Sequence, residues 1–168
     1  PLILTNILAG KSLPIYGDGM NVRDWLHVDD HCRGIDLAIS KGRVGETYCI
    51  GGRNEAPNLD IVHELCRQID RRFKAEPDLA KRFPQCPSAG GSDNTSLITH
   101  VTDRPGHDRR YAIDPTKASE ELGYEPSMTF ESGMSQTVDW YLENQKWWES
   151  VMDGSYRNWI ETNYRNRV

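Results

Sequence analysis

The segment SLITHVTDRPGHDRRYAID, residues 96–114, carries signals for a strand, a turn and a helix start, and similar strand and helix signals recur in the rest of the chain. Its first seven residues are rich in β-branched side chains, which favours a strand. A Pro-Gly turn follows, and three arginines, one histidine and three aspartates stand within residues 103–114. Asp114 and Pro115 then form a typical helix start. The segment therefore predicts a strand that leads through a charged turn into a helix.

The chain before this segment shows the same alternation. Residues 2–10 predict a helix that ends at a glycine, and residues 12–16 and 45–52 predict short strands. Between these two strands we expect a helix capped by Asp29 or Asp30. Four apolar residues recur at helical spacing and are expected to form its buried face: Val28, Cys32, Ile35 and Ile39.

Two further helices flank the opening segment. Asn58 is placed to cap the first, whose expected buried stripe is Ile61, Val62, Leu65, Cys66 and Ile69. Residues 74–96 carry three prolines and two glycines and predict an irregular surface loop. A short helix is expected to end at Gly123, and Thr129 to cap a last one with a stripe of Phe130, Met134, Val138, Tyr141 and Leu142. Residues 1–168 thus predict one α/β domain, a small sheet with flanking helices.

The bulk composition limits the classes of partner. With 168 residues, a net charge of −5 and a pI of about 5.5, the chain has no overall field that favours nucleic acid or acidic membranes. We therefore expect neither partner, and any anion site must be local. No apolar run approaches the ~18 residues of a membrane span. Four cysteines without a C-x-x-C motif favour the reducing cytoplasm, with the thiols as small core residues.

Two arginines stand at the ends of predicted elements, where ligand-binding side chains collect. Arg23 follows a glycine-rich loop, and Arg104 follows the strand that opens the segment. A guanidinium group presents a planar fork of donors that suits the paired oxygens of a phosphate. The alternative for Arg23 is an ion pair with Asp24. The alternative for Arg104 is an ion pair with Asp103 or Asp108, and spacing alone favours both ion pairs.

The other motifs do not complete a catalytic centre. HVDDH, residues 27–31, lacks the glutamate of a zinc motif and spans a predicted helix start, so we expect no metal there. The glycine-rich loops at residues 17–19 and 51–52 do not lead from strand to helix as dinucleotide binding requires. Arg109 and Arg110 are expected to pair with neighbouring carboxylates. The chain also lacks G-x-S-x-G, a phosphate loop and Tyr-x-x-x-Lys, and we expect no catalytic residue in it.

Five stretches carry a family resemblance: LPIYGDGMNVRDWLHVDDH, GETYCIGGRNE, DRPGHDRRYAID, ELGYEP and TFESGMSQTVDWYL. Together they are similar to the carboxy-terminal portion of the dTDP-glucose 4,6-dehydratases, which are extended short-chain dehydrogenase/reductases. The resemblance implies a lyase in which an amino-terminal Rossmann domain holds NAD and the acid–base groups. The smaller carboxy-terminal portion would hold dTDP-glucose or dTDP. The implied product is dTDP-4-keto-6-deoxyglucose, a precursor of dTDP-rhamnose.

The resemblance also implies site residues. Arg23 and Arg104 match the arginines that clamp the diphosphate, which reverses the preference from spacing. Asn58 matches another residue of the nucleotide site. The remaining matching positions are Pro14, Ile15, Tyr16, Asp103, Pro105, Gly106, His107 and Tyr164. Cys49 departs from the family, which commonly has asparagine there.

The motifs of the Rossmann domain are absent, so this chain alone is expected to be inactive and to bind no NAD. Its first helix opens in the middle of a pattern, which indicates a truncated chain. The chain is expected to form a homo-oligomer or to associate with a separate Rossmann domain. Two other readings stay open: a free-standing binding or assembly module, and part of a UDP- or GDP-sugar dehydratase or epimerase.

Overall fold

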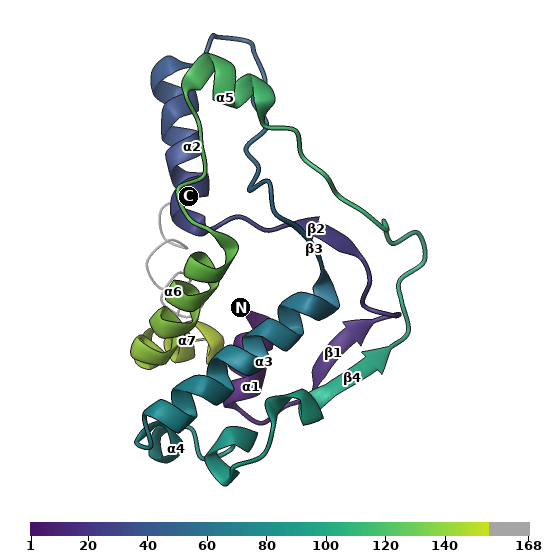
Figure 1. Ribbon diagram of the computed structural model, residues 1–168, viewed down its shortest axis with the longest axis vertical. Coiled ribbons are helices and arrows are strands. Elements are labelled where there is room, and N and C mark those ends of the chain that lie inside the picture. Colours follow the sequence, from purple (N-terminus) through teal and green to yellow (C-terminus); the bar gives the residue numbers. More distant parts are fainter. Residues whose placement is uncertain (155–168) are drawn as a thin grey trace, which may run out of the picture.

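Residues 1–154, the part of the chain that the computed structural model describes, form a mixture of helices and short strands (Figure 1). The elements in chain order are α1 (Leu2–Leu8), β1 (Leu13–Tyr16), β2 (Val22–Asp24), α2 (Val28–Lys41), β3 (Glu55–Pro57), α3 (Asn58–Ala75), α4 (Leu79–Arg82), the 3-10 turns η1 (Pro87–Gly90) and η2 (Asn94–Leu97), β4 (Ile98–Val101), α5 (Thr116–Leu122), α6 (Phe130–Glu143) and α7 (Gln145–Met152). The mixed α/β class expected from the sequence is confirmed.

The strands form two separate sheets, where the sequence predicted a single small one. β1 pairs with β4 in parallel, with Tyr16 opposite Val101. β2 pairs with β3 in the antiparallel sense, with Arg23 opposite Ala56. Because parallel strands end at the same edge of a sheet, the residues that follow β1 and β4 lie close together. The charged turn after β4 therefore begins beside Tyr16.

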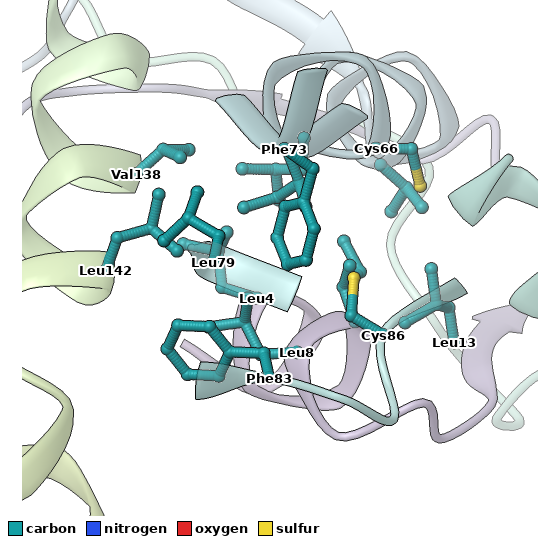
Figure 2. Close-up of a cluster of buried hydrophobic side chains, with 14 of the residues drawn as sticks. Leu4, Leu8, Leu13, Cys66, Phe73, Leu79, Phe83, Cys86, Val138 and Leu142 are labelled. Carbon is teal, nitrogen blue, oxygen red and sulfur yellow. The ribbon is translucent and has the colours of Figure 1, made fainter. Parts of the chain in front are cut away.

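The larger hydrophobic cluster, called the main core below, lies between α1, β1, α3, α4 and α6 (Figure 2). All five residues of the stripe predicted for α3 are buried in it. In α6, Val138 and Leu142 are buried, while Phe130, Met134 and Tyr141 pack against the same cluster. Both predicted stripes are confirmed because each helix finds another layer of this chain to cover its apolar face.

The predicted surface loop at residues 74–96 is wrong in one respect. Prolines and glycines do break it into short turns, α4, η1 and η2. However, Leu79, Phe83 and Cys86 are almost completely buried and face α3 in the main core. Burying each large apolar side chain stabilises the fold by roughly 1.5–3 kcal/mol. The segment is therefore a packed layer, and its composition obscured this because the apolar residues have no regular period.

A second, much smaller cluster holds together what is called the peripheral unit below: α2, residues 42–53 and α5 (Figure 1). Its buried members are Ala118, Leu122 and Tyr124, and Leu37, Ala38, Tyr48 and Ile50 pack against them. The Tyr124 hydroxyl donates to the backbone oxygen of Gly51 at 3.0 Å. The cluster is too small to cover every apolar side chain of the unit.

The buried face predicted for α2 is wrong. Its apolar stripe is exposed, with Ile39 80% exposed, and Val28, Cys32 and Ile35 are exposed as well. The helix instead packs through Asp30, Gly34, Leu37, Ala38 and Lys41, which lie on the opposite side of a 3.6-residue helix. The face that packs holds a buried aspartate and a glycine, which are not hydrophobic residues. Hydrophobic periodicity therefore predicted burial of the opposite face, which is exposed.

The strand predicted at residues 45–52 is also absent from the structure. Residues 46–52 run in irregular backbone, and no described residue forms a ladder with them. A strand needs a neighbour for its backbone N–H and C=O groups, and β propensity alone does not provide one. Cys49 in this segment and Cys32 in α2 are exposed, contrary to the expectation for core thiols, whereas Cys66 and Cys86 are buried.

Helix ends follow the predictions only in part. His27, rather than Asp29 or Asp30, caps α2 and accepts from the Asp29 N–H. Pro57 precedes α3, so Asn58 is its first helical residue and not its cap. Thr129 caps α6 and Gly123 ends α5 with a φ of 72°, both as predicted.

Candidate functional site

The charged turn lies against β2 because the backbone of β2 bonds to it. Val22 donates from its N–H to the carbonyl of Arg109 at 2.8 Å and accepts from the N–H of Tyr111 at 3.1 Å. These two bonds extend the β2–β3 pair by one more chain segment. They also place the next residue of β2, Arg23, beside the side chains of His107 and Tyr111.

Arg23 is held from several sides. Its Nη1 donates to the Val22 carbonyl at 2.6 Å, and its Nη2 donates to the Asp108 carbonyl at 3.2 Å. The same Nη2 lies 3.0 Å from His107 Nε2. The guanidinium carbon lies 4.2 Å from the ring centroid of Tyr111, a cation–π distance. These partners are two backbone carbonyls, an imidazole nitrogen and a phenol ring, and Arg23 forms no ion pair with a carboxylate within residues 1–154.

Arg104 stands on the other side of the same turn. Its guanidinium carbon lies 5.6 Å from the ring centroid of Tyr16, and it forms no ion pair with any described residue. The hydroxyl of Tyr111 donates to Asp108 at 2.6 Å, which raises the pKa of Tyr111, while the charges of Arg23 and Arg104 both act to lower it. The two guanidinium groups thus lie on neighbouring aromatic side chains, Arg23 on Tyr111 and Arg104 on Tyr16, whose ring contacts His107.

The turn itself is closed by its own residues. The His107 N–H donates to the Arg104 carbonyl at 3.2 Å, and Gly106 adopts a φ of 72°, a left-handed conformation that favours glycine. Asp103 accepts from the Arg104 N–H at 2.8 Å and lies 2.6 Å from His107 Nδ1. The hydrogen bond from His107, followed by the one from Arg104, lowers the pKa of Asp103. The carboxylate therefore stays ionised and fixes the turn.

A cavity of about 190 Å³ opens at this turn, lined by Arg104, Pro105, Gly106, His107, Asp108 and Tyr111. Four of these are residues that the family resemblance marked: Arg104, Pro105, Gly106 and His107. The cavity is small and polar, which suits a phosphate group better than an apolar ring. The structure thus gathers most of the turn residues around one hollow, and Arg23 of β2 contacts three of the lining residues, His107, Asp108 and Tyr111, without lining the cavity itself.

The other candidate residues do not all lie at the cavity. Tyr16 is half-exposed and its ring contacts His107 edge-on at a centroid distance of 6.2 Å, so it lies at the site. Pro14 shares its side of β1, whereas Ile15 points into the main core. Asn58 lies at the start of α3, and its N–H donates to the Asn21 carbonyl. Tyr164 lies outside the described residues.

Ion pairs follow the sequence expectation for two neighbouring arginines. Arg109 binds Asp18 at 2.9 Å, and Arg110 binds Glu55 at 2.6 Å. The ion pairs that spacing favoured for Arg23 and Arg104 are wrong. Asp24, the expected partner of Arg23, instead accepts from the backbone N–H groups of Gly52 and Asn54.

Two residues of the site were missed by the sequence analysis. Tyr111 supplies the ring beneath Arg23, and its only sequence signal is its place directly after two arginines. Asn21 is almost fully buried; its side chain donates to the Asp108 carbonyl, and its own carbonyl accepts from Asn58. Asn21 thereby joins the charged turn to α3. No local sequence pattern predicts these two hydrogen bonds.

The strand connections among the described residues differ from a glycine-rich dinucleotide turn. β1 leads into a glycine turn, but the next element is β2 rather than a helix, and β3 leads into α3 without a glycine. Within residues 1–154 no three His, Cys, Asp or Glu side chains gather as metal ligands. No helix of that part is long and apolar enough to cross a bilayer.

The family model described as GDP-mannose 4,6 dehydratase matches residues 1–137. The chain is 51% identical over 157 residues to a dTDP-glucose 4,6-dehydratase of Xanthomonas campestris pv. campestris, and 47% identical over 167 residues to one of Escherichia coli. These alignments cover 94% and 99% of this chain but 41% and 42% of the relatives. The chain therefore spans about two fifths of the length of these relatives.

Solved structures of nucleotide-sugar enzymes are also similar to this chain. A dTDP-glucose 4,6-dehydratase of Bacillus anthracis in complex with NAD matches with a TM-score of 0.70 and 46% identity, over 89% of this chain and 40% of that one. One of Streptomyces venezuelae, solved with NAD and a dTDP ligand, matches with a TM-score of 0.72 and 44% identity, over 89% and 39%. A UDP-glucose 4-epimerase of Thermotoga maritima with UDP-glucose matches at 26% identity and a TM-score of 0.65, over 86% and 39%.

Proposed function

This chain belongs to the GDP-mannose 4,6 dehydratase family, and we propose that it forms the nucleotide-sugar-binding portion of a dTDP-glucose 4,6-dehydratase. The homology to these dehydratases favours a sugar-nucleotide dehydration as the reaction of the whole enzyme. The observation that carries the binding role is the pair of guanidinium groups, Arg23 and Arg104, which have no carboxylate partner among the described residues. Two arginines that form no ion pair with a described residue, at a turn that lines a polar cavity, favour the binding of an anion.

A diphosphate is the anion that fits this arrangement. It presents oxygens on two phosphorus atoms, so each arginine can donate to one phosphate. Each charge-assisted hydrogen bond contributes roughly 1.5–3 kcal/mol, more than the ~0–1 kcal/mol of an exposed ion pair. Because the whole chain carries a net charge of −5, this affinity comes from the local site and not from a general attraction of anions.

Titration calorimetry with dTDP, thymidine monophosphate, UDP and GDP tests the binding role. We expect heat with dTDP and weaker binding of the monophosphate, which has no second phosphate for the second arginine. Tighter binding of UDP or GDP than of dTDP would favour the UDP- or GDP-sugar alternative. A folded sample, checked by circular dichroism, that binds none of the four nucleotides would contradict the proposal.

The proposed role assigns hydride transfer and water elimination to residues outside this chain. The described residues hold neither a dinucleotide turn nor a Tyr-x-x-x-Lys pair, so the chain by itself is proposed to be inactive. Incubating it with dTDP-glucose and NAD should leave the sugar nucleotide unchanged. Formation of the 4-keto product above a protein-free blank would contradict this part of the proposal.

The peripheral unit supports association with a Rossmann-type portion. The apolar stripe of α2 is exposed and segment 45–52 has no strand partner among the described residues, and an α/β layer with a free sheet edge could cover the first and pair with the second. The test mixes this chain with the part of the Xanthomonas relative that it does not match. We expect a complex by light scattering and slower hydrogen exchange in residues 45–52. No complex would contradict the association.

The free-standing assembly alternative predicts a different result for the same surface. In that case the stripe of α2 would be covered by a second copy of this chain. Light scattering on the chain alone separates the two readings: a defined dimer favours assembly, and a monomer that binds the Rossmann-type portion favours the proposed function.

A further inference from the structure

His107 is enclosed between an anion and a cation. Its side chain is only 7% exposed, and its two ring nitrogens face different partners. Nδ1 lies 2.6 Å from the carboxylate of Asp103, and Nε2 lies 3.0 Å from Nη2 of Arg23. The ring of Tyr16 stands edge-on against the imidazole. Asp103, His107 and Arg23 thus form a chain of two polar contacts that joins the charged turn to β2.

The chemistry of the partners fixes where the imidazole proton lies. An ionised carboxylate only accepts, so Nδ1 must carry the proton that it donates to Asp103. A guanidinium group only donates and does not deprotonate in proteins, so Nε2 must accept from Arg23. A proton on Nε2 would set two donors against each other at 3.0 Å. The geometry is therefore consistent with one form only, the neutral imidazole with its proton on Nδ1.

We propose that His107 is a positioning residue for Arg23: Asp103 fixes its Nδ1–H tautomer, and its Nε2 then holds the guanidinium group against the charged turn. The Val22 and Asp108 carbonyls occupy two other N–H groups of Arg23, and Tyr111 restricts the plane of the guanidinium. Nε–H and one N–H of Nη1 remain without a partner within residues 1–154. These two donors are left for an anionic ligand.

This inference rests on the proposed function for the identity of the ligand, but the tautomer is a property of the protein alone. It also separates two roles for His107. A histidine that merely contacts the ligand could hold its proton on either nitrogen in the free protein. A histidine that positions Arg23 must have Nε2 unprotonated before any ligand arrives.

The first test is the ¹⁵N spectrum of the imidazole groups in the ligand-free protein, with His107 assigned by its loss in His107→Gln. We expect Nδ1 to show the shift of a protonated nitrogen and Nε2 that of an unprotonated one. Asp103→Ala removes both carboxylate oxygens, so the two signals should move toward the averaged values of exchanging tautomers. Imidazolium or an Nε2–H tautomer in the wild type would overturn the inference.

The second test is the affinity for dTDP in two variants of His107. His107→Phe keeps the ring volume and removes the acceptor, so we expect dTDP to bind about tenfold more weakly. His107→Gln can place its side-chain oxygen near the position of Nε2 and should recover most of that loss. Equal losses in both variants, or no loss in the Phe variant, would overturn the positioning role.

The two tests also separate this inference from the proposed function. If the wild-type spectrum shows the Nδ1–H tautomer but dTDP does not bind, the proposed nucleotide site is contradicted while the contact from His107 to Arg23 stands. If dTDP binds but the tautomer is wrong, the nucleotide site stands and the positioning role is lost.

Discussion

The main core and the peripheral unit use similar sequence patterns with different results. α3 and α2 both carry apolar residues at helical spacing, yet the stripe of α3 is buried and the stripe of α2 is exposed. The two regions lie at opposite ends of the molecule in Figure 1. The main core closes on itself, with α1, α4 and α6 around α3. The peripheral unit covers one side of α2 and leaves the other side open.

The difference shows that α2 is suited to contacts on two faces. One face holds Asp30 and Gly34 and packs against α5 and Ile50. The other holds the exposed apolar stripe. A helix that is apolar or packed on both sides is typical of an element between two layers. The peripheral unit thus leaves one apolar helix face open, whereas the stripes of α3 and α6 in the main core are covered by other elements of the chain.

Thiol reactivity should show the largest contrast between the two regions, because each holds two cysteines. Cys32 and Cys49 of the peripheral unit are exposed, and Cys66 and Cys86 of the main core are buried. Burial raises the pKa of Cys66 to about 12 and also raises that of Cys86. Since thiolates are the reactive form and the main core must open first, we expect labelling of the buried pair to be at least ~10³-fold slower.

Alkylation followed by mass spectrometry measures these rates in one sample. Four thiols that react at similar rates would remove the distinction between the regions. Addition of a partner that covers the stripe of α2 should slow Cys32 while leaving Cys66 and Cys86 unchanged.

Matched isoleucine substitutions should give the next largest contrast. Ile69 in α3 is fully buried and Ile39 in α2 is 80% exposed. Ile69→Ala removes buried methyl groups from the main core and should lower the free energy of unfolding by about 2–5 kcal/mol. Ile39→Ala removes a side chain that contacts water and should change it by less than about 0.5 kcal/mol. Urea denaturation of both variants tests this, and a loss of comparable size in Ile39→Ala would show that the stripe is covered in solution.

The carboxylate that joins α2 to the turn before α6 should have an intermediate effect. Asp30 is almost fully buried, and burial works against its ionisation. Hydrogen bonds from Ser127 and Met128, together with the charge of Arg33, outweigh that effect and lower the pKa of Asp30. We expect Asp30→Asn to lower the free energy of unfolding by about 1–3 kcal/mol at pH 7, since buried donors lose their acceptor.

The pH dependence of this effect has a defined sign. Because the folded-state pKa of Asp30 lies below the unfolded value of about 4, its contribution is complete above that value and is lost as the pH falls through the folded pKa. The difference between wild type and Asp30→Asn should therefore shrink in acid. The exposed neighbour gives the control, since Asp29→Asn should change stability little at either pH. A difference that is the same at pH 7 and pH 3 would contradict the assignment.

The hydrogen bond inside the small cluster should have the smallest effect on stability. Tyr124 is fully buried, and its hydroxyl donates to the Gly51 carbonyl. Tyr124→Phe should cost about 0.5–1.5 kcal/mol. Tyr48→Phe, which removes a hydroxyl bonded at the surface to Glu121, should cost less. If both variants were equal to wild type in thermal unfolding, the bond to Gly51 would not hold residues 45–52 in place.

The sequence predicted those parts of the fold whose covering layer lies within the chain. The stripes of α3 and α6, the strands β1 and β4, the Gly123 end of α5 and the Thr129 cap of α6 follow local rules that the structure confirms. The predictions of the buried face of α2 and of a strand at residues 45–52 were wrong for a common reason. Periodicity and β propensity describe what a segment can bury or pair, but they do not say whether a partner is present.

The candidate site could be predicted only through the family resemblance. Arg23 and His107 are 84 residues apart, and spacing alone favoured ion pairs that do not form. Tyr111 and Asn21 were missed because their roles depend on the hydrogen bonds between β2 and the charged turn. These are contacts between distant segments, and a single sequence without its fold gives no local signal for them.

The affinity of dTDP for Arg104→Ala and Arg109→Ala tests most directly whether uncompensated guanidinium groups bind the diphosphate. The two arginines lie in the same segment, but Arg109 is paired with Asp18 and Arg104 is paired with no carboxylate among the described residues. We expect Arg104→Ala to weaken binding at least about tenfold and Arg109→Ala to leave it within about twofold. Equal losses in the two variants, or an unchanged affinity in Arg104→Ala, would contradict the proposed diphosphate site.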